Sequence, residues 1–370
     1  MPRHRSRGIA LAASVFALAL IAALIAGAFF AARQEMRLGE NVQSAERSFD
    51  AAEAGLHSVV AQWDPGTYDG LSPGGSASFS GLLPGGSGSF SGTVLRLNRR
   101  LFLIRSTGQD PGGVSLRSLA GLVRLMPVPL VSGAAISVTG QFVAGAGTLV
   151  RGEDQRPLGM DCPAAGSAVP GVAITDAGGL SVPGCADSSC IHGDPPVRFV
   201  PALGDSAARE DAAAWAALTA MATNVYDGEA TANPSPVGTS TTCDTSTRDN
   251  WGETAVPADV AGCTRHYPVI YARGNLRVTG GSGQGILLVG GDLDVEGGFT
   301  FYGPVVVRGR LTMRGGGGRL TGGVEASSAV LLPGEAGSAE IGFSRCAVAN
   351  ALLSRAPAIP LAERSWAELF

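Results

Sequence analysis

Two hydrophobic patterns follow one another in the N-terminal part of the chain. From Ile9 to Ala32 every residue is apolar or small, and none carries a charge. At about 1.5 Å of rise per residue, a helix over this run is long enough to cross a hydrocarbon core of roughly 30 Å. Beyond it, apolar residues recur at alternating intervals of four and three, which places them along one helix face. These residues are Leu38, Val42, Ala45, Phe49, Ala52, Leu56, Val59 and Trp63.

Together the two patterns predict one long helix. No proline lies between Pro2 and Pro65, so the helix is expected to run from about Ile9 to Trp63. Its first part, residues 9–32, is a predicted transmembrane segment, and its extension is expected to pack on a folded domain through the apolar stripe. An intermolecular coiled coil is the alternative interpretation of the stripe, and we favour packing within the chain.

Basic residues precede the apolar run. Because Arg3, Arg5 and Arg7 lie before it, the positive-inside rule predicts that residues 1–8 form a cytoplasmic leader and that the body is exported. Two further arginines just beyond the span reduce this asymmetry. A cleavable signal peptide is the alternative, although its apolar region usually covers only about 7 to 15 residues.

Short extended segments follow the helix. A glycine- and serine-rich stretch, Pro73–Gly81, is echoed by Pro84–Gly92, and these glycines are typical of turns beside short strands. Thr93–Leu97 and Leu101–Ser106 then predict a hairpin, and Val114–Met126 a further extended segment. Residues 33–127 are therefore expected to combine the helix extension with a small antiparallel sheet.

An internal repeat dominates the distal part. Three segments with a common glycine-bounded pattern contain Leu276, Leu293 and Leu311, at offsets of 17 and 18 residues. Each follows an apolar strand, as in the stacked turns of a parallel β-helix, where inward side chains are buried against the turns above and below. We expect Leu276, Leu293 and Leu311 to form one inward ladder, and Val278, Val295 and Met313 another.

The repeat suggests how the remaining chain is divided. Residues 266–345 are predicted to form the β-helix turns, with an early turn in 128–150. Residues 151–265 between them are interpreted as a cysteine-containing insertion with a helix at Ser206–Asn224. Residues 346–370 are expected to cap the open end, with an amphipathic helix over Pro360–Phe370.

The N-terminal residues also carry a family resemblance. Arg7-Gly8-Ile9, the apolar run and the later segment Phe49-Asp50-Ala51-Ala52-Glu53-Ala54-Gly55-Leu56 make residues 7–60 similar to PilX-like type IV pilus assembly proteins, which are minor pilins. The specific part of this family motif consists of Phe49, Ala51, Ala52, Glu53, Ala54 and Leu56. One departure is Ala13, which occupies the position where major pilins carry Glu.

The resemblance implies a fold and a set of partners. It implies a pilin-like α+β head behind the transmembrane helix, cleavage by a prepilin peptidase between Gly8 and Ile9, and packing of the helix among other pilin-like subunits. The chain would then be a single-pass protein of the bacterial inner membrane with its body in the periplasm or outside the cell. The expected fold is this helix and head, followed by a mainly β body with a parallel β-helix of 17–18 residues per turn.

Charge and cysteine content narrow the function. The net charge is only -4 and no lysine is present, so no nucleic-acid partner is predicted. All six cysteines lie beyond the anchor, which suggests disulfides in an exported body, and Cys243 with Cys263 is the candidate pair. No Cys-x-x-Cys occurs, and we predict no metal site and no cofactor.

One row of carboxylates is a candidate for a catalytic or calcium site. Asp292, Asp294 and Glu296 alternate along one strand and share a face. Because the repeat aligns Glu296 between Thr279 and Arg314, ion pairing between turns is the favoured interpretation. With no nucleophile motif either, the chain is predicted to be a structural pilus or secretion-fibre component and not an enzyme. The alternatives are a secreted or surface β-helix that binds or cleaves polysaccharide, and a bactofilin-like polymer.

Overall fold

The computed structural model describes residues 9–128, 130, 133–183, 185, 190–201, 203–254, 256–334, 337–361 and 366–369. Two compact units make up the chain. The first unit consists of Met1–Arg124 and Ala358–Phe370, and we call its part from residue 43 on the head; the second unit, the body, is Leu125–Pro357.

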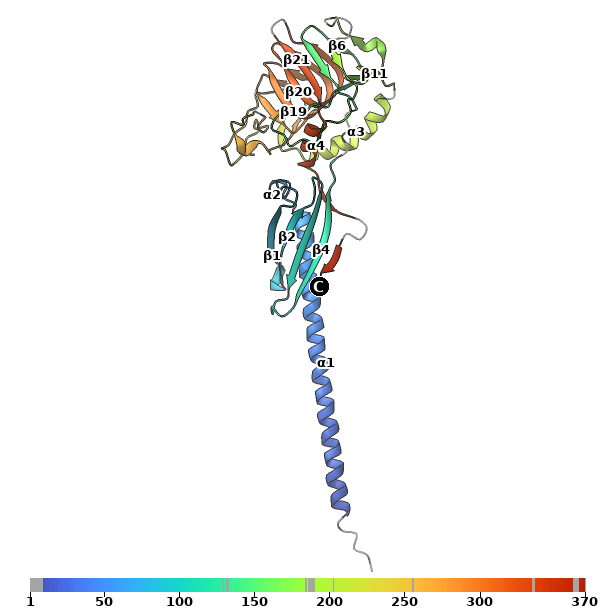
Figure 1. Ribbon diagram of the computed structural model, residues 1–370, viewed down its shortest axis with the longest axis vertical. Coiled ribbons are helices and arrows are strands. Elements are labelled where there is room, and N and C mark those ends of the chain that lie inside the picture. The colour runs from blue at the N-terminus through green and yellow to red at the C-terminus, as the bar shows by residue number, and fades with distance from the viewer. Residues whose placement is uncertain are drawn as a thin grey trace, which may run out of the picture. The chain divides into compact units, whose positions relative to one another are not determined.

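One helix, α1 (Ile9–Ala61), forms the N-terminal part of the first unit and ends two residues before the predicted limit of Trp63 (Figure 1). Its apolar first part is long enough to cross a membrane and is not covered by any other described part of the chain. Farther along, Ser48, Ala51, Ala52 and Val59 are buried. The predicted change from an all-round apolar helix to a one-sided one is therefore confirmed.

An antiparallel sheet covers the second part of α1. Its strands follow one another in chain order, and the predicted hairpin around Asn98 is formed by the second and third of them. The two glycine- and serine-rich segments pair with each other as the first hairpin. The elements are α2 (Pro65–Tyr68), β1 (Ser76–Leu82), η1 (Pro84–Gly86), β2 (Ser89–Arg96), β3 (Leu101–Gln109) and β4 (Leu116–Leu125).

The helix and the sheet approach each other at backbone distance. A Cβ atom at Gly108 of β3 would overlap the backbone of Ser48 and Ala52 in α1. A Cβ atom at Gly55 of α1 would in turn overlap the hydroxyl of Ser106. Because glycine and alanine face one another here, the sheet lies closer to α1 than larger side chains would allow.

The C-terminal segment corrects one expectation. Instead of an amphipathic helix over Pro360–Phe370, the chain forms β22 (Ala358–Pro360) and β23 (Trp366–Leu369) along the outer edge of β4. The Trp366 ring lies edge-on to Phe49 of α1, with 6.3 Å between ring centroids. A strand is favoured over a helix here because it pairs with the β4 edge and covers the Phe49 ring. Neither neighbour can be inferred from the local sequence.

The body is mainly β, and its strands pair in parallel within one 17-stranded sheet of the described residues. Three ladders run through it, and the two long strands β19 and β20 pass through all three. In one ladder Leu276 pairs with Leu293 and Leu293 with Leu311, as the repeat predicts. The strands are β5 (Ile136–Val138), β6 (Phe142–Ala144), β7 (Thr148–Arg151), β8 (Val172–Ile174), β9 (Leu180–Ser181), β10 (Ile191–His192), β11 (Val197–Phe199), β12 (Asn224–Tyr226), β13 (Ala230–Ala232), β14 (Val269–Ala272), β15 (Leu276–Val278), β16 (Ser282–Gln284), β17 (Ile286–Val289), β18 (Leu293–Val295), β19 (Phe299–Arg314), β20 (Gly317–Leu332) and β21 (Ser338–Phe343).

Stacking order in the body differs from chain order. The early strands β5 and β6 pair with β20, near the end of the repeats, and β8 pairs with β5 on the other side. After α3 (Leu203–Ala220), the chain adds β12 and β13 beside β14 and β15, at the opposite end of the stack. Residues 151–265, expected as an insertion, thus supply strands at both ends of the sheet. Their short strands lack the repeated leucine spacing, which is why the repeat did not reveal them.

Corners of the repeated turns explain the glycine pairs of the sequence. Gly280 and Gly281 follow the first repeat with φ of 137° and 83°, and Gly297 and Gly298 follow the second with φ of 69° and 77°. Residues other than glycine rarely adopt these backbone angles, so a glycine pair allows the chain to turn after each strand.

Three disulfides lie in the body. Cys243 and Cys263, the pair singled out from the sequence, are bonded, and so are Cys162 with Cys346 and Cys185 with Cys190. Beside the first pair, Trp251 is fully buried against Phe299, with 5.8 Å between ring centroids, and its Nε1 donates to the Tyr226 hydroxyl at 3.0 Å. The loop that carries Trp251 therefore closes the β12 end of the core. On one side of the sheet α4 (Arg345–Leu353) packs against β19.

The close contact between α1 and β3 leads to a first prediction. Gly108→Ala should destabilise the head by about 1–3 kcal/mol, because its new methyl group displaces the helix backbone. Hydrogen–deuterium exchange of β2 and β3 peptides in the detergent-solubilised chain would measure this as faster exchange. Gly39→Ala is the matched control: no atom lies within 4 Å of its added Cβ, and exchange should be unchanged or slower. Equal exchange in both variants would contradict the proposed contact.

Candidate assembly surface

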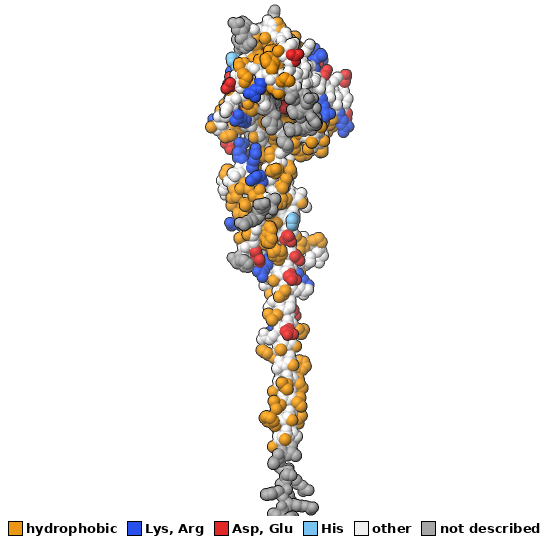
Figure 2. All heavy atoms as spheres, turned by 90° about the vertical axis from the view of Figure 1, so that its right-hand side faces the viewer, with side chains coloured by type: hydrophobic (Ala, Val, Ile, Leu, Met, Phe, Trp, Pro, Cys, Tyr) orange, Lys and Arg blue, Asp and Glu red, His pale blue; other side chains and the backbone are white. Residues whose placement is uncertain are grey.

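The uncovered part of α1 offers the clearest candidate surface. Between the apolar run and the head, Met36, Leu38 and Val42 have exposed fractions of 67%, 61% and 57%. Figure 2 shows hydrophobic side chains along this part of the helix. Charged and amide side chains separate them, so the surface is amphipathic and has no partner among the described residues. Its chemistry suits another helix of the same kind better than water.

The structure divides the predicted stripe into two parts. Leu38 and Val42 are exposed, whereas Ala52 and Val59 are buried by the sheet. The other members, Ala45, Phe49, Leu56 and Trp63, are partly buried. Packing within the chain thus accounts for the distal part of the stripe and leaves the proximal part free for another role.

Residues of the family motif lie where α1 meets the sheet. Ala51 and Ala52 are fully buried, and Phe49 contacts Trp366 of β23. Ala54 and Leu56 are partly buried, and the exposed Glu53 lies 3.8 Å from the Nε2 atom of His57. The motif therefore supplies small residues for close helix–sheet packing and polar residues for the outer face of the helix.

A cluster of Trp63, Asp69 and Arg96 lies at the end of α1, and the sequence did not predict it. The Nε1 atom of Trp63 donates to Oδ1 of Asp69 at 3.1 Å, and the second carboxylate oxygen of Asp69 is buried with no hydrogen bond. Arg96 donates to the carbonyl oxygens of Asp69 and Leu71. Burial raises the pKa of Asp69 to about 6, against the opposing effects of the Trp63 hydrogen bond and the Arg96 charge. Nothing in the local sequence shows that this aspartate is buried.

The carboxylate row of the body forms ion pairs between turns. Glu296 accepts from Arg277 at 2.8 Å and from Arg314 at 3.0 Å, and Arg314 also donates to Asp294 at 2.9 Å. The Arg277 hydrogen bond in particular holds the pKa of Glu296 below its ordinary value. Side chains bonded in this way are engaged in holding neighbouring turns together.

Asp292 has a separate structural role. Its Oδ1 accepts the backbone N–H of Arg310 at 2.8 Å, and its own N–H donates to Oδ1 of Asn275 at 2.9 Å. Gly291 and Gly309 leave room for these side-chain oxygens, because a Cβ at either position would overlap them. The repeated Gly-Asn and Gly-Asp pairs therefore hydrogen-bond each turn to the next.

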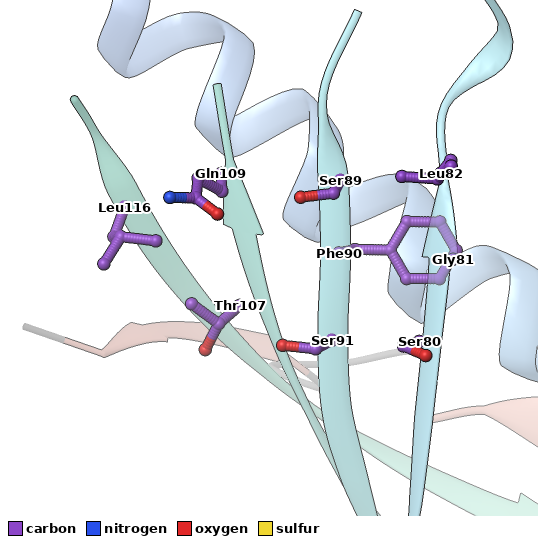
Figure 3. A pocket seen from close by; sticks show the side chains of 9 residues that line it. All are labelled: Ser80, Gly81, Leu82, Ser89, Phe90, Ser91, Thr107, Gln109 and Leu116. Atoms are coloured by element: carbon purple, nitrogen blue, oxygen red, sulfur yellow. The ribbon is translucent and has the colours of Figure 1, made fainter. Parts of the chain in front are cut away.

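A shallow hollow of about 330 Å³ lies on the head sheet (Figure 3). Its side chains are hydroxyl, amide and apolar groups, and none is titratable. Strand register places Ser80, Ser91, Thr107 and Ser118 in one row across β1 to β4. The lining residues are Ser80, Gly81, Leu82, Ser89, Phe90, Ser91, Thr107, Gln109 and Leu116. This composition offers hydrogen bonds but no acid, base or nucleophile activated by a neighbour.

Two further predictions concern the cleavage site and metal binding. Gly8 lies outside the described residues, and Ile9 is the first residue of α1. Within the described part of the chain, no three His, Cys, Asp or Glu side chains form a group that could hold a metal ion.

The chain has a loose structural similarity to a solved pilin. No protein-family model and no curated protein matches the chain. Among solved structures, the chain is similar to the crystal structure of the competence-associated pilin ComZ from Thermus thermophilus, at 12% sequence identity and a TM-score of 0.28. The match covers 88% of this chain and 97% of that one. Such a score reflects a loose correspondence of folds, so the proposals below rest on the residues of this chain.

The Asp69 cluster leads to a second prediction. Since the folded state raises the pKa of Asp69 to about 6 from 3.8, the protonated form stabilises the head below about pH 4, and this stabilisation is lost as the pH rises through 6. Asp69→Asn keeps an acceptor for Trp63 without the charge. It should stabilise the head by about 1–3 kcal/mol at pH 8 and by much less at pH 4.5, as measured by thermal unfolding. Asp50→Asn, at an exposed position on α1, is the control for the change from Asp to Asn itself. An equal effect of Asp69→Asn at pH 4.5 and pH 8 would refute the assignment.

Proposed function

We propose that this chain is a structural or assembly component of a type IV pilus or a related secretion fibre, similar to PilX-like minor pilins. The observation that carries the proposal is the division of α1 into an uncovered apolar part and a part buried by the head sheet. A helix of this kind suits both a membrane anchor and later packing among other helices. The role is structural and not enzymatic, because the carboxylates considered for catalysis are bonded between turns.

The proposed location follows from the same helix. Residues 9–32 cross the bacterial inner membrane once, the leader stays in the cytoplasm, and the head and body lie in the periplasm or beyond. Three disulfides in the body support an oxidising compartment. The partners are the membrane, other pilin-like subunits and a prepilin peptidase.

The body completes this proposal as a parallel β-helix that presents a rigid surface. Three parallel ladders in register, inward leucine and valine rows, and side-chain hydrogen bonds from turn to turn support this architecture. Each turn of such a solenoid is buried only by its neighbours, so its ends need covers. The Trp251 loop supplies one at the β12 end.

Processing gives a direct test of the membrane part. Purified from membranes of a strain with an active prepilin peptidase, the mature chain should begin at Ile9, as read by mass spectrometry of its N-terminal peptide. Recovery of a chain that starts near Phe29 or Arg33 would instead indicate a signal peptide and exclude the pilin-like anchor.

The assembly surface is tested by two matched charges on α1. Val42→Asp should leave a folded, membrane-inserted chain whose amount in the sheared fibre fraction falls at least about tenfold, because an unpaired carboxylate is costly to bury between helices. Val59→Asp places the same charge under the sheet, where Val59 is 5% exposed, and should unfold the head and lower total protein. Unchanged incorporation of Val42→Asp would exclude the exposed part of the stripe as the assembly surface.

A further inference from the structure

Strand β1 forms one outer edge of the head sheet, and β22 and β23 together form the other edge, along β4. Among the described residues, β1 pairs only with β2, in an unbroken register from Ser76 to Leu82. At the other side, β23 pairs only with β4. The outward N–H and C=O groups of both strands are therefore unpaired within the described part of the head.

Neither β1 nor β23 contains a proline, and both pair in unbroken register with their neighbours, although β23 is only four residues long. Strand β1 contains no charged residue, no proline and no break in its register with β2. The charge of β23 is Glu368, which bonds to Arg117 at 3.0 Å. Exposed apolar side chains lie on both edges instead: Leu82 at 81% on β1, and Trp366 at 61% on β23. Edges of this kind are templates for strands of other polypeptides.

Strand directions determine which edges can meet. Because each neighbouring pair from β1 to β23 is antiparallel, β1 and β23 run in the same direction. Helix α1 lies along this axis, since Ser48 is near Gly108 at one end of β3 and Trp63 packs on Phe102 at the other.

Copies anchored in one membrane have their α1 helices parallel. Antiparallel pairing of two β1 edges requires a two-fold axis through the sheet, which would point the two α1 helices in opposite directions. Pairing of β1 in one copy with β23 in the next requires no reversal. It also provides hydrogen-bond partners for the unpaired N–H and C=O groups of both edges at once.

We propose that the heads of this protein associate edge to edge, with β1 of one copy in parallel register beside β23 of a second copy. The contact is head-to-tail, so it continues in a row instead of closing as a dimer. The proposal rests on the membrane anchor of the preceding section, which fixes the common orientation. Main-chain hydrogen bonds hold the contact, and the hydroxyl-lined outer face of Figure 3 extends from copy to copy.

Paired cysteines test this arrangement in the full-length, membrane-embedded chain. Strand register places Ser78 and Ala367 in the same row of the outer face, through Thr93, Arg105 and Ala120. Within one copy they are four strand spacings apart, roughly 19 Å, which is too far for a disulfide. Oxidation of the Ser78→Cys, Ala367→Cys variant should therefore give linked dimers and higher multimers, and never an internal bond. Ser76→Cys and Ser80→Cys, each with Ala367→Cys, cover registers shifted by two residues.

Two controls separate edge pairing from random collision. Thr93→Cys with Ala367→Cys places the first thiol one strand inward on the same face, and should leave monomers. Adding Ser80→Lys to the Ser78→Cys, Ala367→Cys variant charges the edge and should reduce linked multimers at least about fivefold. Monomers throughout the three-variant panel, in chains that fractionate with the membrane and react with maleimide, would overturn the edge contact alone. Failure of the chain to fractionate with the membrane would instead remove the anchor and, with it, the common orientation.

Discussion

The head is held to α1 by a contact between backbones. The backbone of Gly108 in β3 lies against the backbone of Ser48 and Ala52, and Gly55 of α1 lies against the Ser106 hydroxyl, so no large side chain separates the two elements at these points. The position of the sheet on the helix depends on this closeness. Because the sheet lies directly on the helix, Trp63 is brought beside Asp69 and Trp366 beside Phe49. The rows of hydroxyls lie on the opposite, outer face of the sheet. Small residues in the family motif thus have a packing reason.

The same helix faces two environments in succession. Its first part is apolar all round and uncovered, which is stable in lipid or among other helices, and its second part is buried on one side by the sheet. The amphipathic segment from Met36 to Val42 joins the two and is covered by neither. Under the proposed function, this segment is where subunits leaving the membrane exchange lipid contacts for contacts with one another.

In the body, the apolar core contributes stability, and polar groups fix the register of the strands. Leucine and valine rows bury the interior, and any register that keeps them inside is acceptable to the core alone. The Oδ1 atoms of Asn275 and Asp292 each accept a backbone N–H of the following turn, and Arg277, Glu296 and Arg314 bond across three turns. These directional bonds select one register, which gives the recurring carboxylates of this face a structural role.

Local patterns in the sequence determined α1, the hairpins, the leucine ladder of the repeats and the polar row beside it, because each depends on spacing along one chain segment. The Cys243–Cys263 pair was also chosen from the sequence. Only the tertiary structure decided the rest. It placed β5 and β6 beside β20, returned the C-terminal strand β23 to the head and buried Asp69 beside Trp63. These outcomes depend on which distant edge or surface is available after the local elements have formed. That availability is a property of the assembled fold, and no window of sequence contains it.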